Sequence, residues 1–226
     1  GESFELPIND QETGDAIHGF LYSRAMQVRS ISDNELLLGY RTHGDCSGYP
    51  FELDITARYE LTPGSFRLTL TATNGGSRGL PVTLGWHPYF TLPGVERVDE
   101  LLLQLPAKRY VAVDRRLIPT GELPEVEDTP WDFSSLRPVG AGDLDLGFPL
   151  EGRQILLRAP EEKGRSLTMD LGGAFRYCQL FVPPNRGSIA VEPLTAATNA
   201  FNQPELGLTI LEPGEEVSGS CRLSLS

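Results

Sequence analysis

Apolar and polar side chains alternate over most of the chain, most clearly between Phe51 and Glu60. Apolar residues stand at every odd position from Phe51 to Tyr59, and polar residues occupy the even positions. This period of two indicates a strand with one buried and one solvated face. After the turn sequence 62–65, the same alternation returns from Phe66 to Thr73 and ends before Asn74-Gly75-Gly76. The pattern predicts an antiparallel hairpin.

Glycine and proline, at 24 and 18 residues, divide the rest of the chain into short segments. Residues 119–152 are rich in proline, glycine and acidic residues and predict long loops with little regular structure. The sequence contains no convincing amphipathic helix, and its best short helical pattern, at 194–201, is one or two turns at most. The chain predicts an all-β fold, a large antiparallel β-sandwich that forms one domain over residues 1–226. Further strands are predicted at 35–42, 81–90, 100–105, 154–158, 166–171, 176–182, 188–192, 207–211 and 216–225.

Composition excludes several classes of protein. Hydrophobic residues make up 39% of the 226 residues and charged residues 22%, which is too apolar for a disordered chain and too polar for a membrane protein. The net charge of −12 disfavours nucleic acids and anionic lipids, because both attract basic surfaces. We therefore expect neither nucleic acid nor a membrane as a partner.

The cysteines Cys46, Cys178 and Cys221 are odd in number and widely spaced. This arrangement argues against a disulfide framework and fits a reducing compartment, so we predict a cytoplasmic protein. No signal peptide is expected, since the first residues contain neither a basic region nor an apolar core. No local run of histidine or cysteine suggests a metal site, and we expect no metal and no cofactor.

His87 is the first candidate for chemistry. In the segment Pro81–Phe90, Trp86 lies on the apolar side of the expected strand, whereas His87 and Tyr89 lie on the opposite, more polar side. Histidine exchanges a proton near neutral pH, and Pro88 favours an extended backbone at His87. The same pattern is also typical of a half-buried histidine that bonds only to the backbone.

Glu192 is the second candidate. It follows small and apolar residues in the segment Ser188–Pro193 and shares a face with Ser188 and Ala190. Glutamate is seldom buried without a specific role, but a solvated glutamate at a strand end would give the same pattern. Weaker candidates are His18 before a glycine, Asp145 in an acidic loop, and Gln179 in a short strand.

Taken in order, these fragments resemble the aldose 1-epimerase (galactose mutarotase-like) family. The most specific matches are His-Pro-Tyr-Phe at 87–90 and the run from Glu192 to Asn202, and the resemblance spans most of the chain. The other matching pieces are Ala16–Phe20, Thr73-Asn74, Pro81–Gly94, Asp145–Phe148 and Gln179–Phe181.

The resemblance implies a β-supersandwich and an enzyme that interconverts the α and β anomers of an aldose. It implies that Glu192 is the general base at the C1 hydroxyl and that His87 is the general acid at the ring oxygen. It further implies that His18, Asp145 and Gln179 bind sugar hydroxyls. This chemistry is consistent with the residues themselves, because opening a hemiacetal needs one base and one acid on neighbouring oxygens.

The chain departs from the family pattern in two ways. Family members carry N-terminal strands with a sugar-binding arginine ahead of the piece that matches His18, and this chain begins after them. We therefore expect an N-terminally truncated domain, or a site that Arg24 or Arg41 completes. Trp86 stands where many galactose mutarotases have asparagine, which indicates a divergent subgroup with no implied preference for galactose.

Three alternatives remain at this stage. A hexose 6-phosphate epimerase would need cationic side chains at the rim of the site, for which Arg24, Arg41, Arg176 and Arg186 are available. A carbohydrate sensor could keep the fold without turnover. A glycosidase is the least favoured, because it needs two carboxyl groups that flank the scissile bond.

Overall fold

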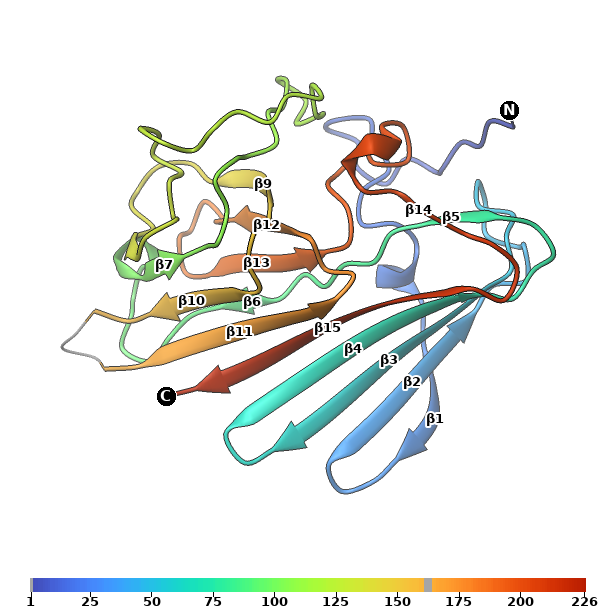
Figure 1. The fold of residues 1–226 in the computed structure, drawn as a ribbon, viewed down its shortest axis with the longest axis horizontal. Coiled ribbons are helices and arrows are strands. Elements are labelled where there is room, and N and C mark those ends of the chain that lie inside the picture. The colour runs from blue at the N-terminus through green and yellow to red at the C-terminus, as the bar shows by residue number, and fades with distance from the viewer. Residues whose placement is uncertain (1, 161–163) are drawn as a thin grey trace.

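The computed structural model describes residues 2–160 and 164–226, and its regular structure is dominated by antiparallel β-sheet (Figure 1). The largest sheet has nine strands in the order β1-β2-β3-β4-β15-β11-β10-β7-β8. Its strands are β1 (Gln27–Ile31), β2 (Glu35–Arg41), β3 (Leu53–Thr62), β4 (Ser65–Asn74), β7 (Leu102–Gln104), β8 (Arg137–Pro138), β10 (Gln154–Arg158), β11 (Ser166–Gly173) and β15 (Glu216–Leu225).

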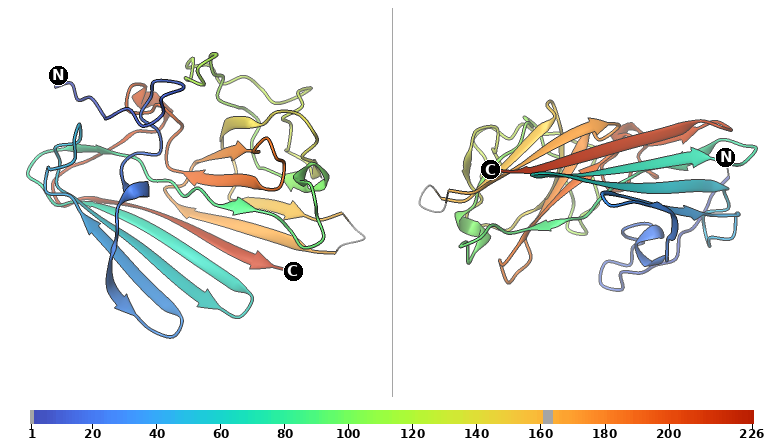
Figure 2. Two further views of the ribbon diagram at one scale, coloured as in Figure 1. Left: turned by 180° about the vertical axis from the view of Figure 1, so that it is seen from behind. Right: turned by 90° about the horizontal axis from the view of Figure 1, so that it is seen from below.

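A second sheet has four strands in the order β6-β13-β12-β9. These strands are β6 (Tyr89–Phe90), β9 (Asp145–Pro149), β12 (Tyr177–Phe181) and β13 (Ile189–Leu194), and a separate two-stranded pair joins β5 (Leu80–Val82) to β14 (Thr209–Leu211). The four-stranded sheet lies beside the half of the large sheet that contains β10 and β11, while the β1–β2 and β3–β4 hairpins project beyond it (Figures 1 and 2). The prediction of an all-β antiparallel sandwich is confirmed.

The hydrophobic core lies between the two sheets. Phe148 on β9, Leu180 on β12 and Ile189 on β13 are fully buried. Complete burial of a side chain of this size contributes about 1.5–3 kcal/mol. On the large sheet, Ile155 and Leu103 belong to the same core cluster. The alternation of the strands therefore gives each sheet one apolar face toward this core, which leaves the opposite face of the small sheet free for polar groups.

The predicted β3–β4 hairpin is present. Its ladder runs without interruption from Leu53 opposite Asn74 to Thr62 opposite Ser65. Gly64 in the turn has a φ of 77°, a left-handed conformation that glycine adopts without a steric penalty. The turn sequence and the alternation thus determine this part of the large sheet.

Four details differ from the sequence prediction, and the first is that β1 was not among the predicted strands. Residues 81–90 form the end of β5 and the short β6 instead of one strand, and Pro88, which lies directly before β6, lacks the N–H group that a continuous ladder needs. The short helical pattern at 194–201 forms no helix: Leu194 ends β13, turns and bends follow it, and a 3₁₀ turn, η4 (Pro204–Leu206), comes next. The predicted loop region 119–152 contains β8 and β9, and β9 brings Asp145 into a sheet.

Two further 3₁₀ turns, η1 (Leu21–Ser23) and η2 (Val98–Glu100), connect strands of the large sheet to the rest of the chain. Nowhere in the described residues is there a helix of the length and apolar character that crossing a bilayer requires. Cys46, Cys178 and Cys221 are free thiols, and all three are buried.

Candidate functional site

The polar face of the four-stranded sheet collects the candidate residues. Gln179 on β12 lies opposite Glu192 on β13 and opposite Gly147 on β9, and residues directly opposite in a ladder point to the same side. By the same register, Tyr89 pairs with Ala190, and Asp145 pairs with Phe181. We call the face that carries Asp145, Gly147, Gln179, Glu192 and Tyr89 the site face.

His87 reaches the site face from the segment just before β6. The bridge between Gly85 and Leu194 and the hydrogen bond from the Trp86 N–H to the Pro193 carbonyl tie this segment to β13. The Nε2 atom of His87 lies 3.3 Å from Oε1 of Glu192. The two residues are far apart in sequence, and the sheet brings their side chains into direct contact.

The protonation of this pair follows from its burial. The side chain of Glu192 is only 10% exposed, and this burial, with the negative charge of Asp145, raises the pKa of Glu192 to about 8. Burial and the neighbouring His18 lower the pKa of His87. The contact is therefore not a salt bridge between two full charges: near neutral pH the pair holds one proton, which the carboxyl and the imidazole can share.

A second polar pair lies next to the first. The Gln179 side-chain amide donates to Oδ1 of Asp145 at 2.7 Å, between strands β12 and β9. Gly147 makes room for this arrangement, because a Cβ atom there would lie 3.0 Å from the Gln179 amide oxygen and 3.5 Å from a methyl group of Val111. The pair offers hydrogen-bond donors and acceptors beside Glu192, as a polyhydroxylated ligand requires.

His18 joins the site from the N-terminal segment. Its ring meets the His87 ring edge to face, with centroids 5.3 Å apart. His18 has a φ of 61°, which is unusual for a residue other than glycine. The side chain of Asn9 bonds to both backbone groups of the preceding residue, Ile17. The Asn9 side chain accepts from the Ile17 N–H at 2.7 Å and donates to the Ile17 carbonyl at 2.8 Å and to the Tyr22 hydroxyl at 2.9 Å.

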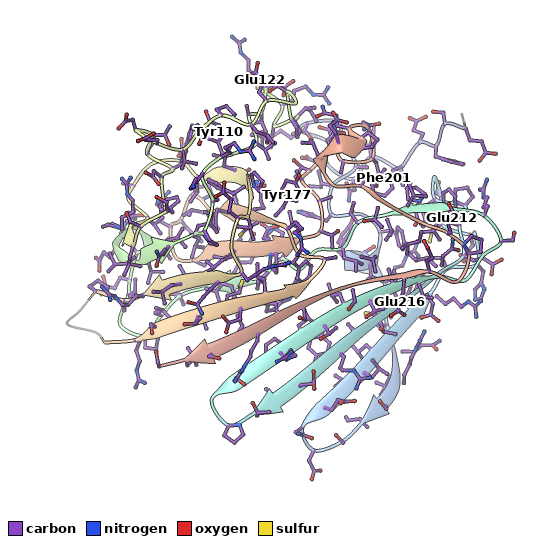
Figure 3. The ribbon with its side chains drawn as sticks, in the orientation of Figure 1. Tyr110, Glu122, Tyr177, Phe201, Glu212 and Glu216 are labelled. Atoms are coloured by element: carbon purple, nitrogen blue, oxygen red, sulfur yellow. The ribbon has the colours of Figure 1, made fainter. Side chains whose placement is uncertain are left out.

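Tyr177 closes one end of the site face. Tyr177 lies two residues before Gln179 on β12, so both side chains point to the same face of the sheet. Its ring packs closely on Gly207, where a Cβ atom would lie 3.0 Å from the ring. Gly207 ends η4 with a φ of 105°. Figure 3 shows Tyr177 beside β12 and β13, with the exposed Phe201 on the turn that follows Glu192. Tyr177 thus anchors this turn to the small sheet.

All five residues predicted for the site lie on or beside one face of one sheet. Trp86 instead packs against the core, with Phe66 and Phe90 as aromatic neighbours, as its apolar side of the segment predicts. Two contributors, Asn9 and Gly147, were absent from the sequence prediction. Asn9 stands in an irregular segment without periodicity, and the need for glycine at 147 depends on the side chain of Gln179 across the ladder.

The four arginines considered for the rim have other partners or other neighbours. Arg41 lies 3.7 Å from Glu52, and Arg24 acts electrostatically on Asp45 and Cys46. Arg176 donates to the backbone carbonyls of Gly173 and Phe175, and Arg186 is buried, with donors on the carbonyls of Gly140 and Gly142 and on Asp99. Within residues 2–160 and 164–226, no group of three metal-ligating side chains lies close enough to hold an ion.

Comparison with known proteins identifies the family. The profile described as Aldose 1-epimerase matches residues 1–224, which is nearly the entire chain. This chain belongs to the aldose 1-epimerase family. The family assignment accounts for the β-rich fold.

Individual members of the family support the assignment. YihR of Escherichia coli K12, whose function is uncharacterized, is 29% identical, and the alignment covers 95% of this chain and 69% of YihR. Human galactose mutarotase is 26% identical, with 96% of this chain and 70% of the human protein covered. A candidate aldose 1-epimerase from Escherichia coli K12 superposes with a TM-score of 0.84 at 26% identity, over 99% of this chain and 76% of that structure. The galactose mutarotase-like fold is therefore established for this chain.

Proposed function

We propose that this protein interconverts the α and β anomers of an aldose by acid–base opening of the hemiacetal ring. The observation that carries the proposal is the 3.3 Å contact between His87 Nε2 and Glu192 Oε1. In a cyclic aldose the C1 hydroxyl and the ring oxygen are bonded to the same carbon. An acid and a base that act on these two oxygens must therefore lie side by side, as these two groups do.

In the proposed reaction, the Glu192 carboxylate removes the proton from the C1 hydroxyl and the C1=O bond forms. The C1–ring oxygen bond breaks, its electron pair stays on the ring oxygen, and that oxygen takes a proton from Nε2 of His87. Rotation about C1–C2 presents the other face of the aldehyde. Ring closure then returns one proton to His87 and the other to the C1 oxygen from Glu192, so the enzyme ends as it began.

The single proton held by the pair fits this cycle, because each half-reaction needs one protonated and one unprotonated partner. In the resting chain the raised pKa of Glu192 and the lowered pKa of His87 leave that proton on the carboxyl. Its transfer across the 3.3 Å contact to Nε2 gives the form in which Glu192 is the base and His87 the acid. His18, Asp145 and Gln179 would bind the sugar hydroxyls.

The proposal favours a sugar without a phosphate group. A phosphate dianion needs arginine or lysine side chains with free donors near the site. Arg176 and Arg186 direct donors at backbone carbonyls, and Arg41 pairs with Glu52. Asp145 adds negative potential beside Glu192, where an anionic substrate would bind.

Exchange NMR of a panel of aldoses at anomeric equilibrium tests the proposal. We expect the wild-type protein to transfer magnetisation between the α and β anomeric protons of at least one neutral hexose. Glu192→Gln should abolish this exchange, because the amide has nearly the same shape but cannot accept the proton. Exchange seen only with glucose 6-phosphate would mean that the substrate is a sugar phosphate and not a neutral sugar. Sugar binding without exchange would indicate a carbohydrate sensor.

A further inference from the structure

The His87 ring is held by aromatic contacts as well as by Glu192. Tyr89 stacks on it, with centroids 5.0 Å apart and an interplanar angle of 27°. His18 meets another side edge-on, at an interplanar angle of 71°. Two rings and one carboxyl group thus contact the imidazole, and among the described residues the contact with Glu192 is the one made through a ring nitrogen.

The other nitrogen of His87 bonds to no other residue in the described part of the chain. Its Nδ1 atom is buried, and no hydrogen-bond partner for it exists among residues 2–160 and 164–226. A histidine that transfers protons usually has its second nitrogen fixed by a carbonyl or a carboxylate, which sets both the tautomer and the ring plane. The orientation of His87 therefore rests on the contact with Glu192 and on its ring neighbours.

Tyr89 is well placed to supply that orientation. Its backbone pairs with Ala190 on β13, two residues before Glu192, so the strand that carries the carboxyl also fixes the position of Tyr89. The small side chain of Ala190 leaves room on the site face. Phe181 contacts the Tyr89 ring edge to face at 6.4 Å, and Tyr89 nevertheless remains 49% exposed. Such exposure indicates that its ring is not primarily a core residue.

We infer that Tyr89 is a positioning residue, whose ring holds the His87 imidazole in the plane that directs Nε2 toward Glu192 and the reacting oxygens. The inference rests on the proposed acid–base function of His87. The aromatic face of Tyr89, rather than its hydroxyl group, performs this role. A tyrosine face also tolerates the positive charge of an imidazolium, so the stack persists in both protonation states.

The test compares Tyr89→Phe, which keeps the ring, with Tyr89→Leu, which removes it. We expect Tyr89→Phe to retain the wild-type kcat and Tyr89→Leu to lose about two- to tenfold in kcat with little change in KM, the factor that one aromatic pair supplies. The ¹⁵N resonances of the His87 imidazole should show one tautomer in the wild type and Tyr89→Phe, and averaged tautomers in Tyr89→Leu. Tyr89→Met replaces the leucine variant if that chain fails to fold.

Wild-type kcat and wild-type ¹⁵N resonances in a folded Tyr89→Leu variant would overturn the inference. A loss of kcat in Tyr89→Phe equal to that in Tyr89→Leu would also overturn it, because the hydroxyl group would then be responsible. If the wild-type protein has no epimerase activity, the proposed function fails. The ¹⁵N comparison still decides in that case whether Tyr89 orients His87.

Discussion

The buried carboxyl of Glu192 should make folding stability depend on pH in a direction opposite to that of most carboxylates. Burial and the charge of Asp145 raise its pKa from 4.5 to about 8. Between these values the folded chain holds a proton that the unfolded chain has released. Because the folded state binds more protons in this range, the free energy of unfolding falls as the pH rises from about 4.5 to about 8.

The size of this effect follows from the same two pKa values. Each whole step in pKa between the folded and unfolded states is worth about 1.4 kcal/mol. A rise from 4.5 to about 8 therefore corresponds to a loss on the order of 5 kcal/mol across the range. Glu192→Gln removes the titrating group and keeps nearly the same shape, so the variant should not show this loss.

Urea unfolding, followed by tryptophan fluorescence at a series of pH values from about 4.5 to about 9, measures the effect. The informative quantity is the difference in unfolding free energy between wild type and Glu192→Gln, because all other titrating groups are common to both. We expect the variant to gain several kcal/mol of unfolding free energy relative to the wild type as the pH rises. Glu122→Gln is the matched control, since Glu122 is an exposed loop residue (Figure 3).

The control should follow the wild type at every pH. Parallel curves for wild type and Glu192→Gln, with a difference that changes by less than about 0.5 kcal/mol, would refute the reasoning. Such a result would mean that Glu192 ionises at its ordinary pH in the folded chain. The account of a pair that shares one proton with His87 would then be wrong.

Three further variants test other parts of the site. His87→Asn should lower the rate of anomer exchange by about 10²–10⁴-fold and change its pH profile, and an unchanged profile would count against an acid–base role. Asn9→Ala should weaken sugar binding in calorimetry, because the left-handed backbone at His18 loses its support, and equal affinity would show that Asn9 is dispensable. Gly147→Ala should displace the Gln179 amide and weaken binding about two- to tenfold, the worth of one hydrogen bond, and unchanged affinity would exclude a contact between that amide and the sugar.

Much of the site face could be predicted because it lies within regular strands. The period of two placed Glu192 with Ala190, and His87 with Tyr89, on polar sides of their segments. The contact between His87 and Glu192 was implied only by the family resemblance. It depends on the pairing of β6 with β13, and no local pattern in either segment specifies that register.

Other features were hidden because their cause is not local. The glycine and acidic residues around Asp145 indicate a loop, yet pairing with β12 makes this segment strand β9. The segment at 81–90 is divided before Pro88 without a change in its alternation, since extended backbone preserves side-chain direction even where ladder hydrogen bonds are missing. Asn9 acts through its side chain on an irregular segment, for which hydrophobic periodicity gives no signal.

Polarimetry of freshly dissolved α-glucose and α-galactose tests the central claim most directly. The account predicts that the wild-type protein accelerates the decay of optical rotation for at least one of these sugars, in proportion to protein concentration. The same amount of Glu192→Gln should leave the spontaneous rate unchanged. Equal acceleration by both proteins, or no acceleration of any aldose tested by a wild-type protein that binds sugar, would contradict the assignment of Glu192 and His87 as the base and acid of ring opening.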